Sequence, residues 1–64
     1  MNTAPSLKAR FAVGDRVQIV IGFNRGCHGT VMRCFGEQPN CYDVRMKSNS
    51  LIIGYSEHEL EASR

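Results

Sequence analysis

What the sequence lacks excludes several classes of protein. No stretch approaches the roughly 18 consecutive apolar residues of a membrane-spanning helix, which excludes a helical membrane protein. The opening residues, MNTAPSLKAR, hold no apolar segment of the kind that directs secretion, so we expect a cytoplasmic protein with reduced thiols. Neither charge sign dominates, because eight Lys and Arg residues stand against six Asp and Glu residues. Residues 1 to 47 are mildly basic, with seven Lys and Arg residues against three Asp and Glu residues, which permits nucleic-acid contact without requiring it.

The signatures of catalysis are also missing. The chain has no ordered Ser, His and Asp set, no glycine-rich phosphate loop ahead of a helix, and no paired carboxylates in a plausible cleft. Cys27 and His28 are adjacent in the chain, but a nucleophile and its base must meet in space. We therefore expect a protein that is not an enzyme and that carries no cofactor.

The three cysteines are Cys27, Cys34 and Cys41, with six residues between each and the next. Structural zinc sites usually use pairs separated by about two to four residues, so this spacing does not favour a metal site. A disulfide between Cys34 and Cys41 across a hairpin is a second interpretation. In the third, Cys34 is a small core residue, Cys41 lies near the rim, and Cys27 is the most exposed thiol.

Most of the chain is predicted to form short β-strands. Residues 16 to 21 alternate apolar and polar side chains, as a half-buried strand does, and residues 28–35, 41–46 and 51–55 predict three more strands. Ser56 and Glu59 predict a capped helical turn over residues 56–60. Residues 1–9 predict a flexible arm, and residues 10–62 one domain. The expected core comprises Val17, Ile19, Val31, Cys34, Tyr42, Val44, Ile53 and Leu60.

The segment GDRVQIVIGFNRGCHGTV resembles the KOW motif of SH3-like barrels. The shared positions are Gly14, Asp15, Val17, Ile19, Gly22, Gly26, Gly29 and Val31. The resemblance covers roughly residues 11 to 61. It implies an all-β fold, a small SH3-like barrel of four or five antiparallel strands with a short C-terminal helical turn. Barrels of this kind serve ribosomal proteins, transcription factors, photosystem subunits and enzyme accessory subunits, so the resemblance implies a fold more than a function.

Two families with this plan imply different roles. The chain resembles the PsaE accessory subunits of photosystem I, which implies docking onto other proteins. Residues 11 to 17 and Tyr55 also resemble type II dihydrofolate reductases, which implies an oligomeric reductase as a remote alternative. Ile53 stands where that family places an active-site Gln.

Binding is the expected role, through the loop of residues 22–28 and a basic stripe. Phe23, Asn24 and Arg25 sit at the loop tip, where Phe23 either contacts a partner or folds back over the end of the barrel. On strands expected to be neighbours, Arg16, Arg33 and Arg45, with Lys47, form either a basic stripe or an ordinary solvated face. The absence of Trp, with only three Phe and two Tyr, weakens the case for base stacking.

These features indicate which kinds of partner to expect. Nucleic acid or a ribonucleoprotein is the first candidate, and the alternative is a protein-docking accessory subunit or small inhibitor. The uncharged segment Leu51–Tyr55 is also expected to form a strand at the edge of the sheet, where it could pair with a second copy of the chain.

Overall fold

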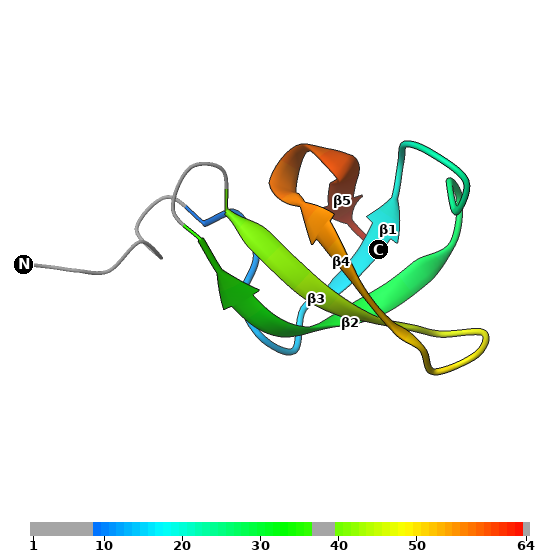
Figure 1. The fold of residues 1–64 in the computed structure, drawn as a ribbon, viewed down its shortest axis with the longest axis horizontal. Helices are drawn as coiled ribbons and strands as arrows, with labels where there is room; N and C mark the ends of the chain where they lie inside the picture. Colours follow the sequence, from blue (N-terminus) through cyan, green and yellow to red (C-terminus); the bar gives the residue numbers. More distant parts are fainter. Residues whose placement is uncertain (1–8, 37–39, 64) are drawn as a thin grey trace, which may run out of the picture.

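The computed structural model describes residues 9 to 36 and 40 to 63 as one antiparallel sheet. Its strands are β1 (Arg16–Ile19), β2 (His28–Phe35), β3 (Cys41–Met46), β4 (Ile52–Ser56) and β5 (Leu60–Ala62). A single turn of 3-10 helix, η2 (Glu57–Glu59), joins β4 to β5. The order across the sheet is β4-β3-β2-β1-β5 (Figure 1). The predicted all-β class, the antiparallel strands and the C-terminal helical turn are confirmed.

The strand bounds follow the predicted pattern closely. Those of β2 and β3 are as predicted, whereas β1 ends two residues early, at Ile19, and β4 is shifted by one residue. The strand β1 ends at Ile19 because the following loop closes there. The Ile19 N–H donates to the Cys27 carbonyl at 2.9 Å, and the Ile19 carbonyl accepts from the Gly26 N–H at 2.8 Å. Ile21 therefore lies in the loop and is exposed.

The sheet curls because its two edge strands are consecutive in the chain. Only the three residues of η2 separate β4 from β5, which lie at opposite edges (Figure 1). The Ser56 N–H donates to Glu59 Oε1 at 2.8 Å, as the predicted capping arrangement requires. The Glu59 carbonyl accepts from the Val20 N–H at 2.9 Å, which ties the turn to the end of β1.

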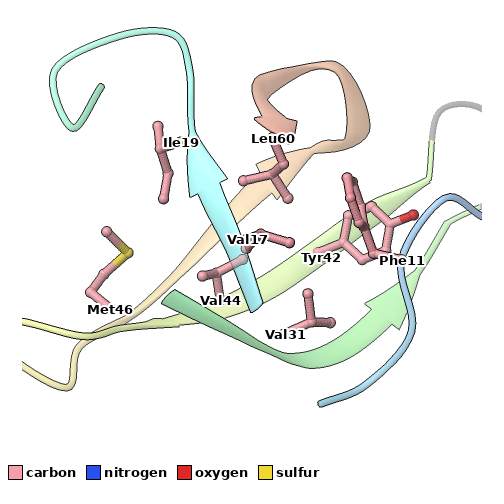
Figure 2. Close-up of a cluster of buried hydrophobic side chains, with 8 residues drawn as sticks. All are labelled: Phe11, Val17, Ile19, Val31, Tyr42, Val44, Met46 and Leu60. Carbon is pink, nitrogen blue, oxygen red and sulfur yellow. The ribbon is translucent and has the colours of Figure 1, made fainter. Parts of the chain in front are cut away.

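Eight buried side chains form the core inside this curl (Figure 2). Six of the eight predicted core residues are among them, while Cys34 and Ile53 are half-buried and pack against the cluster. Phe11 and Met46 complete the core and were not predicted. The Phe11 ring meets the Tyr42 ring edge-on, with centroids 5.3 Å apart, so a residue ahead of the first strand closes one side.

Glycine is required at two kinds of position. A Cβ on Gly29 would lie 2.5 Å from Val44 Cγ1 and 2.6 Å from the Arg45 carbonyl oxygen, so only glycine permits this approach of β2 to β3. In the loop after β1, Gly22 and Gly26 have φ of 91° and 95°, in the left-handed region that favours glycine.

Glu57 holds the chain ahead of β1 against the core. Its Oε2 accepts from the Arg10 backbone N–H at 2.7 Å and from the Tyr42 hydroxyl at 3.1 Å. Burial raises the pKa of the Tyr42 phenol above its ordinary value of 10.0, and the neighbouring Glu57 carboxylate raises it further. Glu57 thus joins the segment ahead of β1 to the core residue Tyr42.

Some predictions fall on parts of the chain that are not described. The N-terminal arm, apart from Ala9, and the centre of the hairpin at residues 37–39 lie outside the described residues. Within the described ranges, no helix has the length and apolar character needed to cross a membrane.

Candidate functional site

One row of side chains crosses three strands on the outer face of the sheet. Thr30 on β2 lies opposite Arg16 on β1 and opposite Arg45 on β3. The inward neighbours Val17 and Val44 are buried, so strand alternation turns the two arginines outward. Two strand spacings separate them, or about 10 Å between backbones.

A second row continues the surface toward the β1–β2 loop. His28 lies opposite Gln18, and its carbonyl accepts from the Lys47 N–H at 2.9 Å, which places Lys47 beside it. His28 Nδ1 lies 2.9 Å from Ser63 Oγ, while the Ser63 N–H donates to the Arg16 carbonyl at 2.9 Å. The end of the described chain therefore folds back beside both rows.

These residues surround a groove of about 510 Å³, called here the basic groove. It is lined by Arg16, His28, Gly29, Thr30, Arg45, Met46, Lys47, Ser50 and Ser63. None of these lining residues is acidic. The strand register brings two carboxylates to its border: Glu61, opposite Gln18 and on the side away from His28, and Asp43, in the row next to Arg45. The groove thus presents cations and hydroxyls to solvent.

The third predicted stripe residue, Arg33, has a different environment. It lies on the same face in the neighbouring row, opposite Asp43, after a shift in register between Val31 and Arg33. Its Nε is 3.1 Å from Asp43 Oδ2, and its guanidinium lies 4.8 Å from the centre of the Phe35 ring. Within the described residues this is the only ion pair. Arg33 therefore has partners within its own chain, although its side chain is 68% exposed, whereas Arg16 and Arg45 line the basic groove.

The predicted loop residues also separate into two kinds. The Phe23 side chain is fully exposed, with a relative accessibility of 102%, so it does not fold back over the sheet. Asn24 is half-buried, and its Nδ2 donates to the Tyr55 hydroxyl at 2.9 Å. Arg25 is exposed, while its backbone N–H donates to the Gly22 carbonyl at 3.1 Å. Asn24 anchors the loop, and Phe23 and Arg25 face solvent.

The three cysteines lie on the sheet and in the loop after β1. Cys34 lies opposite Tyr42, and Cys41 lies opposite Phe35, so consecutive register positions turn the two thiols to opposite faces. That arrangement does not fit a disulfide between them. Cys27 is half-buried and packs against the core, where exposure was expected. Across residues 9–36 and 40–63, no three His, Cys, Asp or Glu side chains meet in a way that could hold a metal ion.

Sequence reasoning missed the polar residues that line the basic groove between its cations. Thr30 could have been found by pairing the predicted strands, because it is the outward residue between Arg16 and Arg45 in the register. Ser50 and Ser63 had no comparable signal. Ser50 enters through the β3–β4 turn, and Ser63 through its hydrogen bond to His28.

What the basic groove can bind follows from its own residues. Guanidinium and ammonium groups make short, charge-assisted hydrogen bonds to phosphate or carboxylate oxygens. Serine and threonine hydroxyls add neutral donors beside them. Comparison with protein-family models, curated proteins and solved structures gives no match, so no relative's function bears on this groove.

Proposed function

We propose that this protein is a binding module without catalytic activity that holds the phosphate backbone of a nucleic acid, free or in a ribonucleoprotein, in the basic groove. One observation carries the proposal. Arg16, Arg45, Lys47 and His28 come from three strands and the turn after the third, and they line one concavity that has no acidic lining residue.

The electrostatics of the groove favour a polyanion over a single carboxylate. The backbones of Arg16 and Arg45 are two strand spacings apart, or about 10 Å. A single small anion would contact both guanidinium groups only if the two side chains leaned toward each other. A chain of phosphates presents repeated charges along its length and releases counterions when several are neutralised. Thr30, Ser50 and Ser63 supply hydroxyls for backbone or sugar oxygens but no base-reading pattern.

We also infer that the fold is an SH3-like barrel with a KOW-like loop. The strand order supports this, because β5 returns to pair with β1 after the turn η2. The positive φ of Gly22 and Gly26 and the close packing at Gly29 support the loop assignment. Such a scaffold leaves binding to its loops and outer face.

The test is a titration of fluorescently labelled single-stranded RNA, single-stranded DNA and duplex DNA, each at several salt concentrations. We expect micromolar binding that weakens steeply with salt, since non-specific dissociation constants are about 10⁻⁴–10⁻⁶ M at physiological salt. Arg45→Gln should weaken binding to all three ligands and lower the salt slope by about one.

Arg33→Gln is the matched control, because it removes the same charge from the same face. Arg33 already pairs with Asp43, so this variant should change the affinity and the salt slope far less than Arg45→Gln. Equal losses in the two variants would show that overall charge, and not the groove, attracts the ligand. No binding by the wild-type protein at low salt would reject the nucleic-acid function.

A second candidate function, docking onto a protein, is favoured by one observation. Phe23 is fully exposed on a loop held by backbone hydrogen bonds and by the Asn24–Tyr55 hydrogen bond. An aromatic side chain presented on a fixed loop can fill a pocket on a partner at low entropic cost. In that case Phe23→Ala would abolish capture of the partner, while Arg45→Gln would leave it intact.

A further inference from the structure

The strand β4 lies at one edge of the sheet and contains no charged residue. It pairs with β3 on one side and has no strand on the other among the described residues. No charged residue occurs between residues 48 and 56, and the side chains of Leu51 and Ile52 are 58% and 54% exposed. Edge strands of monomeric proteins are usually protected by charge, by proline or by a covering segment. The opposite edge, β5, has that protection in Glu61.

The hydrogen bonds of β4 identify which backbone groups face this open edge. The Met46 N–H donates to the Leu51 carbonyl at 2.7 Å, and the Glu57 N–H donates to the Asn40 carbonyl at 3.0 Å. Bonded and non-bonded pairs alternate in an antiparallel ladder, so Leu51, Ile53 and Tyr55 direct their backbone groups toward β3. The residues between them direct their backbone groups outward; they are Ile52, Gly54 and Ser56.

Only part of this outward edge is available. The Ser56 N–H already donates to Glu59 Oε1 at 2.8 Å within the same chain. At Ile52 and Gly54, the N–H and the carbonyl of each residue point outward. The edge therefore offers two donors and two acceptors in strict alternation.

We propose that β4 pairs with β4 of a second copy of this chain, antiparallel and centred on Ile53. In this register Ile52 of each copy lies opposite Gly54 of the other. The two residues then exchange both backbone hydrogen bonds, which gives four bonds in total about the two-fold axis. A register centred on Gly54 would instead need the Ser56 N–H, which Glu59 holds.

Side-chain shape supports the same register. A Cβ on Gly54 would meet only Asp43 Oδ1, at 3.7 Å, so the outer surface above Gly54 is open. The exposed Ile52 side chain of the second copy covers that bare backbone. With no charge on either strand, pairing places no like charges opposite each other.

The pairing does not depend on what the basic groove binds, but it would change how the groove is used. A two-fold axis through the joined β4 strands keeps the outer faces of both copies on one side of a continuous sheet. Arg45 lies opposite Ile52, so the two Arg45 backbones would be roughly 16 Å apart, from three strand spacings and a two-residue offset. If the proposed function holds, a nucleic acid can bridge both grooves and gain avidity.

The experiment measures mass and amide exchange on the full chain across a concentration series. Two chains joined through so short an interface are expected to associate weakly. The sedimentation velocity series should therefore reach a protein concentration of about 1 mM. The mass should rise toward that of a dimer. In the same series, NMR hydrogen exchange at Ile52 and Gly54 should slow with concentration, while the already bonded amides of Ile53 and Ser56 should not change.

The variant Ile52→Lys should remain monomeric, because it sets two like charges beside the axis. Val13→Lys is its matched control, since Val13 is an exposed apolar residue, 65% accessible, outside β4. That variant should associate like the wild type. If Ile52→Lys does not fold, a synthetic chain with an N-methyl group on Gly54 removes one outward donor and keeps the ladder with β3.

Four results would overturn the proposal. They are a wild-type chain that stays monomeric throughout the series, equal loss of association in Val13→Lys, association retained in Ile52→Lys or in the N-methyl chain, and association that leaves the exchange of Ile52 and Gly54 unchanged. Failure of nucleic-acid binding by a confirmed dimer would reject the proposed function and leave the pairing standing.

Discussion

Arg45 and Arg33 differ in partner although they lie on the same face of the same sheet. Arg45 lies opposite Thr30 and Ile52, in a row with Arg16, and its side chain lines the basic groove. Arg33, one row away, lies opposite Asp43 and pairs with it at 3.1 Å. The identity of the residue opposite on the next strand thus decides whether an arginine is available to a ligand.

The largest effect on this comparison should come from Gly29→Ala. The new methyl group would collide with Val44 and with the Arg45 backbone, in the place where β2 and β3 set both rows. We expect a loss of about 3 kcal/mol from the free energy of unfolding, a large share of what so small a domain has. Thermal unfolding by circular dichroism measures it.

Gly54→Ala, measured in dilute solution, is the control for this substitution. A methyl group there meets only Asp43 Oδ1 at 3.7 Å, so the change should stay within about 0.5 kcal/mol. Similar losses in the two variants would show that glycine itself, and not the close approach at Gly29, matters for stability.

A moderate effect is expected from Asp43→Asn, which removes the partner of Arg33. With the carboxylate gone, Arg33 becomes available to the ligand that the groove binds, and we expect affinity for labelled RNA to rise about threefold. Fluorescence anisotropy at fixed salt measures the change.

The double variant Arg33→Gln, Asp43→Asn tests the origin of that gain. It lacks the pair and keeps the net charge of the wild type, so its affinity should return to the wild-type value. A gain that persists in the double variant would mean that loss of the Asp43 charge acts directly on the ligand and that Arg33 plays no part.

The smallest effect concerns the core side of the sheet, where alkali should act on Tyr42. The native phenol has a raised pKa, so above pH 10 it keeps a proton that the phenol of the unfolded chain has lost. Stability is therefore expected to fall as the pH rises from 10 toward the native pKa. Urea unfolding of the wild type and of Tyr42→Phe across this range measures the difference.

The Tyr42→Phe chain should be less stable near neutral pH, because the hydrogen bond to Glu57 is lost, and its stability should depend less on pH above 10. Parallel pH profiles of the two proteins would contradict the role assigned to burial of Tyr42.

Much of the fold could be predicted because its signals are local. The β-branched alternation at Val17 and Ile19 and the glycines of the following loop marked strands and turns close to where they lie. The capping of η2 by Glu59 is also local in the chain. Phe11 was missed because a single aromatic residue ahead of a strand has no periodic pattern, and its burial depends on Tyr42 from a distant strand.

The candidate site was predictable only in part. Alternation along a strand turns Arg16 and Arg45 outward, but it would place Arg33 on the inner face with Val31; Arg33 reaches the outer face only through the shift in register that follows Val31. Which of them faces a ligand depends on register, and the shift between Val31 and Arg33 sets Asp43 beside Arg33. Asn24 looked like a contact residue, but its amide is used by Tyr55 from β4.

The sequence by itself determined the all-β class, the four longer strands, the glycine-dependent loop and most of the core, because each depends on patterns among residues that are close together in the chain. The tertiary structure alone decided the assembly of the basic groove, the engagement of Arg33 and which backbone groups of β4 face its open edge. Those features depend on which strands become neighbours and in what register, and such pairing joins residues that the chain keeps far apart.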